Sequence, residues 1–115
     1  MHEMGIAQQL FEIARDSIPE DIENPEVEQV NLKIGQLAAV VEHSLTFCFE
    51  VIAKDSPLEK AVLKIETVPV TVHCKACGNT WEVDEPVFTC RYCDKNDVEV
   101  VTGREIQITS IVLAE

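Results

Sequence analysis

The sequence predicts an α/β fold: a two-layer domain of two helices on a three-stranded sheet, with a small cysteine-bearing subdomain inserted. Two segments carry apolar residues at helical spacing, and three others alternate apolar and polar residues as half-buried strands do. Two C-x2-C pairs lie between the second and third of these strands. The order along the chain is therefore helix, strand, helix, strand, cysteine-bearing insert, strand.

The first helix and the first strand are both bounded by residues that break regular structure. Residues 4–17 form the predicted helix, because apolar side chains recur every three or four positions, and Pro19 ends it. Residues 26–34 alternate apolar and polar side chains, which is typical of a strand with one buried face. Gly35 closes this strand.

The second helix and the second strand follow the same logic. We expect Ser44 to cap a helix that runs to about Lys54, and residues 61–68 to form the next strand. A strand–helix–strand unit usually pairs its two strands in parallel through a right-handed crossover. Two amphipathic helices would then cover one face of the sheet.

The third strand is predicted over residues 104–113, after a turn at Gly103. Its alternation suggests that one set of side chains faces the core and the other set faces away: Ile106, Ile108 and Val112 against Glu105, Gln107 and Ile111. The chain would thus consist of an α/β domain and a ribbon domain: residues 1–68 with 101–115, and residues 69–100.

Four of the five cysteines form the two C-x2-C pairs: Cys74, Cys77, Cys90 and Cys93. Each C-x2-C turn directs both sulfurs to one point, so two turns can close a tetrahedral cage of four thiolates. Zinc(II) is the default occupant, and iron would give a rubredoxin-like centre. Two disulfides or four unrelated cysteines are the alternatives without metal. Four thiolates leave no position for water or substrate, so the predicted zinc site is structural.

The segment between the cysteine pairs resembles a zinc ribbon. Residues 80–83 read as a short strand after a Gly-Asn turn, and the strands are too short to bury a core. We expect Trp81, Phe88 and Tyr92 to form a miniature core around the metal loops. A subdomain of about thirty residues generally needs such a metal staple to fold.

Charge and composition narrow the class of partner. The chain has 21 acidic and nine basic residues, a net charge of −12, which argues against nucleic-acid binding. No run approaches the roughly 20 apolar residues of a membrane span, and the N-terminus lacks the pattern of a secretory signal. Thiol cysteines without such a signal favour the cytoplasm. A protein or a cation is the expected ligand.

The N-terminus is a second candidate metal site. The Met1 amine, the His2 amide nitrogen and the His2 Nδ1 can close two fused chelate rings, which suits a square-planar ion such as Ni(II) or Cu(II). Glu3 can supply a fourth donor through its backbone nitrogen or its carboxylate. Because this fourth place stays exchangeable, the site suits a protein that releases its metal.

The remaining candidate side chains favour simpler roles. His43 precedes the predicted second helix and is expected to be a capping or surface residue, and His73 a surface residue or an alternative ligand beside Cys74. Cys48 is expected to be a small buried hydrophobe. Three histidines and a closed cysteine cage leave little catalytic apparatus, so we do not expect an enzyme.

Taken together, these features resemble one family over the whole chain. Met1-His2-Glu3 opens a helix, Leu-Lys-Ile-Gly-Gln-Leu ends a strand at 32–37, and the C-x2-C pairs come late. This combination is similar to the HypA family of hydrogenase nickel-incorporation metallochaperones. The resemblance implies a nickel domain built on the α/β layers and a zinc domain made of the ribbon.

The resemblance also implies roles for particular residues and partners. His2 would be the essential nickel ligand, with Met1 giving its amine and Glu3 supporting the site and partner contact. The four paired cysteines would hold structural zinc, and Ni(II) would be the transferred cargo. The implied partners are a HypB-type GTPase, the [NiFe] hydrogenase large subunit and urease maturation proteins, with the chain a monomer or weak homodimer.

Two other classes of function compete with this interpretation. A zinc-ribbon adaptor would bind a protein partner without transferring nickel. A rubredoxin-like electron carrier would hold iron in the cysteine cage. Loss of nickel binding on replacing His2 would favour the metallochaperone, and visible iron–thiolate absorption would favour the electron carrier.

Overall fold

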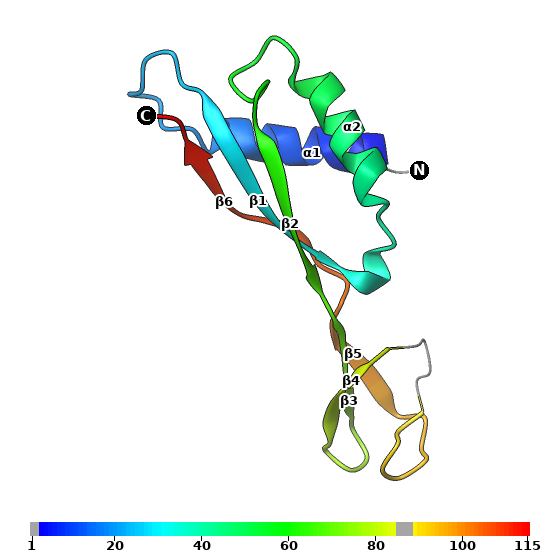
Figure 1. The fold of residues 1–115 in the computed structure, drawn as a ribbon. Coiled ribbons are helices and arrows are strands. Elements are labelled where there is room, and N and C mark those ends of the chain that lie inside the picture. Colours follow the sequence, from blue (N-terminus) through cyan, green and yellow to red (C-terminus); the bar gives the residue numbers. More distant parts are fainter. Residues whose placement is uncertain (1–2, 85–88) are drawn as a thin grey trace. The chain divides into compact units, whose positions relative to one another are not determined.

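The computed structural model describes residues 3–84 and 89–115. These residues form two α-helices, a short 3-10 helix and six strands (Figure 1). In chain order the elements are α1 Glu3–Asp16, β1 Val27–Gly35, η1 Gln36–Ala38, α2 Glu42–Ala53, β2 Val62–Val68, β3 Val70–Cys74, β4 Thr80–Val83, β5 Val98–Thr102 and β6 Ile106–Leu113. None of the described helices is long and apolar enough to cross a membrane.

The chain divides into two compact units. The first comprises Met1–Lys33, Val40–Glu66 and Gln107–Glu115, and the second comprises Ile34–Ala39 and Thr67–Ile106. Ile34–Ala39 belongs to the second unit because its main chain is bonded there: the Gly35 and Leu37 amides donate to the carbonyls of Glu105 and Gly103. The assignment of nickel to the α/β domain and of zinc to the ribbon stays a prediction.

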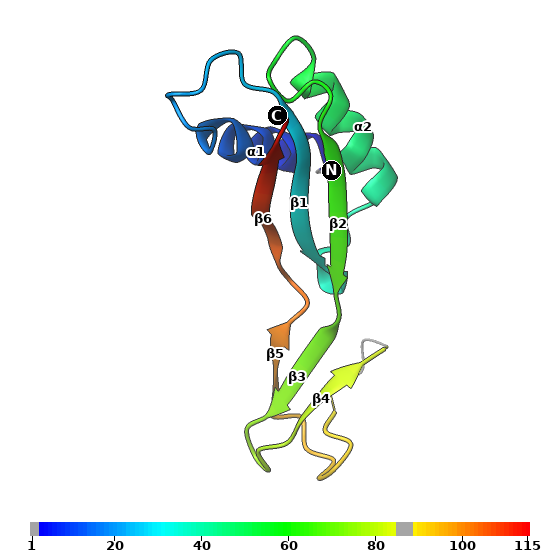
Figure 2. The same cartoon turned by 60° about the vertical axis from the view of Figure 1, so that its left-hand side comes forward.

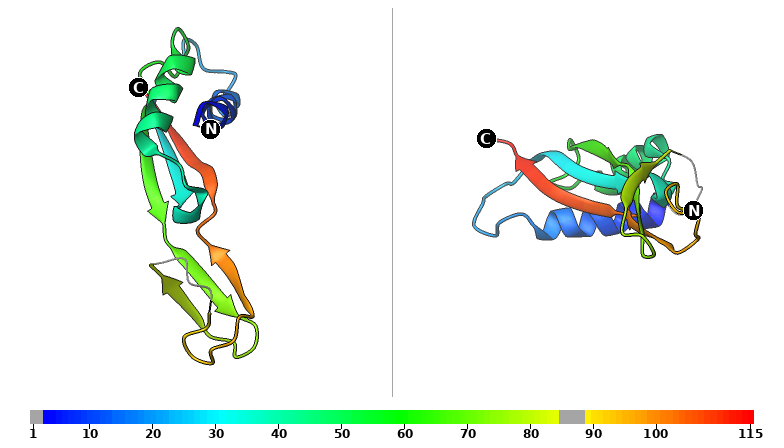
Figure 3. Two further views of the ribbon diagram at one scale, coloured as in Figure 1. Left: turned by 90° about the vertical axis from the view of Figure 1, so that its right-hand side faces the viewer. Right: turned by 90° about the horizontal axis from the view of Figure 1, so that it is seen from below.

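The first unit has two layers, as predicted. Its sheet has the order β2-β1-β6, in which β1 and β2 run in the same direction and β6 in the opposite one (Figure 2). Helix α2 connects the two parallel strands, and both helices lie over one face of this sheet (Figure 3). The α/β fold class predicted from the sequence is therefore confirmed.

The core of the first unit lies between the helices and the central strand. The aromatic rings of Phe11 on α1 and Phe49 on α2 meet edge to face, with centroids 6.2 Å apart. The buried residues recur three or four positions apart on each helix, the spacing of an apolar stripe. They are Ala7, Leu10 and Ala14 of α1, Leu45, Phe49 and Ala53 of α2, and Val27, Val30 and Leu32 of β1.

Helix α2 begins earlier than the sequence suggested. It starts at Glu42 after Val41, whose extended backbone (φ −83°, ψ 107°) holds the N-cap position without a side-chain cap. Ser44 lies inside the first turn, so its predicted capping role is wrong. Ala39, with φ of 54°, turns the chain just before Val41 and thereby brings the helix start forward.

The alternation of buried and exposed side chains along strand β6 is interrupted partway along the strand. Ile108, Ile111 and Leu113 are half-buried, whereas Val112 is 40% exposed. The prediction that Val112 faces the core and Ile111 faces away is therefore wrong. Ile108 and Ile111 are three positions apart, and a regular strand would place their side chains on opposite faces. Because both are half-buried, the pleat must be irregular between them.

The second unit is a small antiparallel sheet of order β4-β3-β5. Val72 in the central strand lies opposite Trp81 of β4 and Val100 of β5. The predicted strand over residues 80–83 is present, and β3 and β5 flank it in the chain. The buried cluster is small and contains two of the paired cysteines: Val70, Val72, Cys74, Trp81, Val83 and Cys90.

Candidate metal centres

The two cysteine pairs converge at the end of the second unit. The four sulfur atoms all lie within 4.8 Å of one another, and none of these cysteines forms a disulfide. The Cys74 and Cys93 sulfurs are 3.7 Å apart, and those of Cys77 and Cys90 are 3.6 Å apart. A tetrahedron with metal–sulfur bonds of about 2.3 Å has edges of about 3.8 Å. The sulfur cage therefore fits a zinc-sized thiophilic ion.

Both pairs are held by the same kind of turn. The Gly78 amide donates to the Cys74 carbonyl over 2.8 Å, and the Asp94 amide donates to the Cys90 carbonyl over 2.9 Å. Gly78 and Asp94 both have positive φ, 81° and 61°. The two turns are thus equivalent, as the repeated C-x2-C spacing predicts.

Amide groups donate to the sulfurs from within these turns. The Tyr92 backbone N–H donates to the Cys90 sulfur over 3.3 Å, and the Asn79 side-chain amide donates to the Cys77 sulfur over 3.4 Å. Such donors stabilise the negative charge of a thiolate. They suit sulfurs that ligate a cation rather than sulfurs that remain protonated.

Taken as thiols, the four groups cannot all lose their protons together. The pKa of Cys77 is lowered to about 6, because the backbone and side-chain amides of Asn79 donate to it. The Lys95 backbone amide lowers the pKa of Cys93, but burial and the neighbouring thiols outweigh it and raise that pKa to about 12. A cation at the centre would supply the positive charge that four thiolates require.

The other residues predicted near the ribbon have separate places. The His73 Nδ1 lies 3.0 Å from the Thr80 hydroxyl across the β3–β4 pair, and His73 is not among the clustered metal-ligating groups. Trp81 is buried and meets the Tyr92 ring edge to face at 5.6 Å, although Tyr92 itself is 58% exposed. Phe88 lies outside the described residues.

At the chain start, the structure describes one of the three predicted nickel-site residues. Met1 and His2 lie outside the described residues. Glu3 begins α1, and its Oε2 accepts a hydrogen bond from the Val41 backbone N–H over 3.1 Å. This hydrogen bond is the main cause that lowers the pKa of Glu3 below 4.5.

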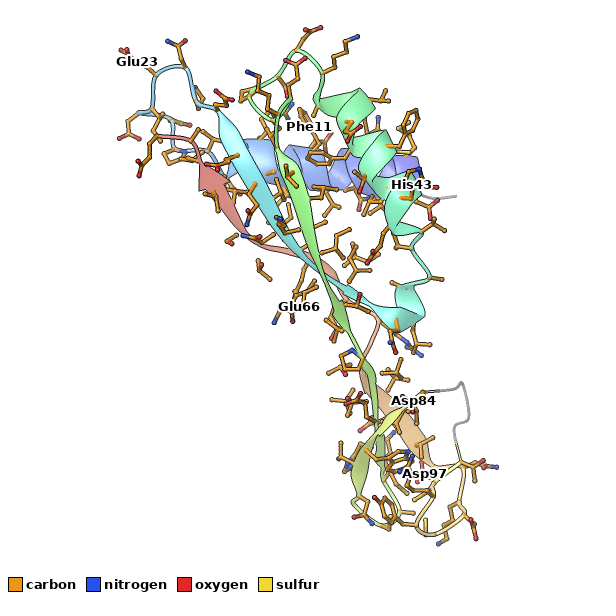
Figure 4. All side chains as sticks on the ribbon, in the orientation of Figure 1. Phe11, Glu23, His43, Glu66, Asp84 and Asp97 are labelled. Carbon is orange, nitrogen blue, oxygen red and sulfur yellow. The ribbon has the colours of Figure 1, made fainter. Side chains whose placement is uncertain are left out.

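This contact attaches the start of α1 to the start of α2. Val41 immediately precedes α2, and His43 is exposed in the first turn of that helix (Figure 4). Glu3 and Val41 are 38 positions apart in the sequence. No local pattern signals such a pairing, so reasoning from the sequence missed it.

Comparison with known proteins shows which family the chain belongs to. The family model described as "Hydrogenase/urease nickel incorporation, metallochaperone, hypA" matches residues 1–113. Hydrogenase maturation factor HypA of Desulfosudis oleivorans is 51% identical over 115 residues, covering all of both chains. The factor of the same name from Desulfatibacillum aliphaticivorans is 43% identical, covering all of this chain and 88% of the relative.

Solved structures share the fold. The solution structure of the Ni metallochaperone HypA from Helicobacter pylori superposes with a TM-score of 0.71 at 22% identity, covering 98% of this chain and 97% of that one. A second solution structure of a HypA protein gives a TM-score of 0.74 over 99% of this chain and 97% of the other. Family match, relatives and fold agree, and the chain belongs to the HypA family of hydrogenase and urease nickel-incorporation metallochaperones.

Proposed function

We propose that this protein is a nickel metallochaperone that binds Ni(II) at its N-terminus and delivers it for maturation of [NiFe] hydrogenase. The family match over residues 1–113, in a chain that begins Met1-His2-Glu3, carries the proposal. On this proposal the protein is a metal carrier in the cytoplasm and not an enzyme. Its metal is cargo, which must be held firmly and still be released.

The proposed nickel ligands are the Met1 amine and the amide nitrogen and Nδ1 of His2. Glu3 has two candidate donors, and its carboxylate already accepts the Val41 N–H. The same carboxylate also accepts a hydrogen bond from the Glu3 backbone N–H. Either group would have to give up a hydrogen bond to bind nickel, so both the backbone nitrogen and the carboxylate remain candidates for the fourth place.

The proposed zinc ligands are Cys74, Cys77, Cys90 and Cys93. Cys74 and Cys90 are part of the small buried cluster of the second unit, so the metal would complete the core. A closed thiolate cage holds zinc as part of the fold, whereas a chelate with an exchangeable fourth position can release its ion. The two centres would thus divide structural and transfer roles between them.

The proposed partners follow from the family. They are a HypB-type GTPase, the [NiFe] hydrogenase large subunit and urease maturation proteins. A net charge of −12 favours partners with a basic face. A zinc-ribbon adaptor and a rubredoxin-like electron carrier are the alternatives that an experiment must separate from this function.

The test is complementation in a host strain that lacks the protein. Wild type should restore [NiFe] hydrogenase activity at low external nickel, and His2→Ala should not. His43→Ala, which removes an exposed histidine of α2, is the matched control and should restore activity like wild type. An adaptor or an electron carrier would function equally well with either substitution, so full activity of His2→Ala would refute the proposal.

A further inference from the structure

We propose that the four-cysteine cluster is also a site of oxidative modification by hydroperoxides. Oxidation joins Cys77 to Cys90 first and Cys74 to Cys93 second, so that two disulfides between the C-x2-C turns replace the metal. This inference rests on the proposed zinc site and does not depend on nickel transfer.

The four sulfurs differ in their access to solvent. Cys77 is exposed and Cys93 is half-buried, whereas Cys74 and Cys90 are both 0% exposed. Each C-x2-C turn therefore presents its second cysteine to solvent and keeps its first cysteine inside. Because cysteine oxidation follows exposure and thiolate character, an oxidant dissolved in water reaches Cys77 first.

Each accessible sulfur has a buried neighbour in the other turn. The two turns lie together at one end of the second unit (Figure 2). Sulfur–sulfur distances are 3.6 Å between Cys77 and Cys90 and 3.7 Å between Cys74 and Cys93. The bond in a disulfide is about 2.05 Å long, so each pair must close by roughly 1.6 Å. Four cysteines can pair in three ways, and these two contacts, which share no residue, select one of them.

The main chain also favours bridges between the turns. Each turn is already closed by its own hydrogen bond, from the Gly78 amide to the Cys74 carbonyl and from the Asp94 amide to the Cys90 carbonyl. The cysteines that we expect to pair are 13 and 19 positions apart in the sequence, against three within a turn. A disulfide that closes a longer loop stabilises the folded chain more. Bridges between the turns would thus replace the link that a metal provides.

The first bridge forms in two steps. The Cys77 thiolate attacks one oxygen of hydrogen peroxide, the O–O bond breaks, and the departing hydroxide takes up a proton to become water. The Cys90 thiolate then attacks the sulfur of the resulting Cys77 sulfenic acid, the S–O bond breaks, and the second hydroxide takes up a proton. Two thiolates are oxidised to one disulfide while the peroxide is reduced to two water molecules. Only two thiolates remain as ligands, so bound zinc should be released.

An amide donor slows attack at the sulfur that the oxidant reaches first. The exposed Asn79 side chain donates to the Cys77 sulfur over 3.4 Å. Such a hydrogen bond stabilises the negative charge of a thiolate, and a stabilised thiolate is a weaker nucleophile. Asn79→Ala removes this donor and keeps the main-chain bond from the Cys74 amide to the carbonyl of residue 79. The substitution should therefore speed oxidation without opening the turn.

The sequence allows the pairing to be determined directly, because a basic residue lies inside each turn. Trypsin cleaves after Lys75 and Arg91 and so separates the two cysteines of each turn. The cysteine-bearing peptides are 65–75 with Cys74, 76–91 with Cys77 and Cys90, and 92–95 with Cys93. The first predicted bridge is therefore internal to one peptide, and the second joins the other two. Every other pairing joins peptide 76–91 to another peptide.

Stepwise oxidation of the full zinc-loaded chain tests the proposal. Cys48→Ser serves as the background, because it removes the fifth cysteine, which lies outside the cluster. Zinc is counted first, hydrogen peroxide is added with a chelating dye that reports released zinc, and remaining thiols are alkylated before digestion. One equivalent of peroxide should give the internal bridge in peptide 76–91 and release zinc. A second equivalent should join peptide 65–75 to peptide 92–95.

Two asparagine variants in the same background test which sulfur is attacked first. Asn79→Ala should release zinc at least about twofold faster than the background chain. The matched control is Asn96→Ala, which removes an exposed side chain of the ribbon that contacts the Thr89 hydroxyl, and it should leave the rate unchanged. Circular dichroism verifies that each variant is folded.

The outcomes separate this inference from the zinc site on which it rests. A chain isolated without zinc would contradict the proposed zinc site, and the pairing of its cysteines would still be determined from the same peptides. Disulfides that join peptide 76–91 to another peptide would overturn the proposed pairing. Zinc retained in an excess of peroxide, or equal rates of release from Asn79→Ala and Asn96→Ala, would overturn oxidation through Cys77.

Discussion

Replacing Gly35 by alanine should strongly destabilise the second unit. A Cβ at this position would lie 2.0 Å from the carbonyl carbon and oxygen of Gly103 and 2.5 Å from the Arg104 nitrogen. Ordinary contacts are 3.4 Å or longer, and backbone atoms cannot rotate away as a side chain can. The two segments must therefore separate by more than 1 Å.

That separation acts on two short hydrogen bonds. The amides of Gly35 and Leu37 each donate over 2.7 Å, to the carbonyls of Glu105 and Gly103. Losing each bond costs about 1 kcal/mol net, and overpacking adds roughly 1–3 kcal/mol. The free energy of unfolding of the second unit should fall by about 4 kcal/mol.

Urea unfolding followed by the fluorescence of Trp81 measures this change, because Trp81 is the single tryptophan and is buried in the second unit. Gly5→Ala is the matched control. Nothing lies within 4 Å of a Cβ at Gly5, which is in α1, so alanine there should stabilise the helix by roughly 0.5–1 kcal/mol. If the free energy of unfolding of Gly35→Ala lies within about 0.5 kcal/mol of the wild-type value in this assay, the steric argument is refuted.

Three further predictions concern the metal centres. In an NMR titration the Val41 amide resonance should follow the Glu3 carboxyl with a midpoint below 4.5, because the Val41 N–H lowers the pKa of that carboxyl. The stability that this contact contributes is present above pH 4.5 and is lost as the pH falls through the midpoint. A midpoint at or above 4.5 would contradict the contact. Cys77→Ser should lose its bound zinc, as measured by atomic emission. Cys48→Ser should retain zinc, because Cys48 lies outside the four-cysteine cluster. Equal zinc content in the two variants would contradict the proposed zinc site. Nickel affinity by calorimetry should be at least about thirtyfold weaker at pH 6 than at pH 8. An amine of pKa about 7.7, such as that of Met1, is about 2% deprotonated at the lower pH and about two-thirds at the higher, and the protons that His2 loses on binding add to this effect. Equal affinities would exclude the amine as a ligand.

Local patterns predicted those parts of the fold that local physics determines. Helical spacing of apolar residues located both helices, and the C-x2-C repeat predicted the sulfur cluster. Each of these signals lies within a few residues of the structure it predicts. The parallel pairing of β1 and β2 also followed, because a helical crossover strongly favours it.

Features that depend on distant partners could not be predicted in this way. Gly35 was expected to end a strand, but its packing against Gly103 depends on a segment far along the chain. The facing of Ile111 changed because β6 is irregular where it pairs with β1. The contact between Glu3 and Val41 joins two helix starts that the sequence does not relate.

Native mass spectrometry of the tag-free protein with its own Met1, titrated with nickel, tests the central claim most directly. Wild type should carry one zinc and one nickel ion, His2→Ala should carry zinc alone, and Cys90→Ser should lose zinc. This pattern would establish a nickel site at the N-terminus that is separate from the cysteine cluster. Equal nickel binding by wild type and His2→Ala would contradict the N-terminal site and leave the chain without a nickel centre of the proposed kind.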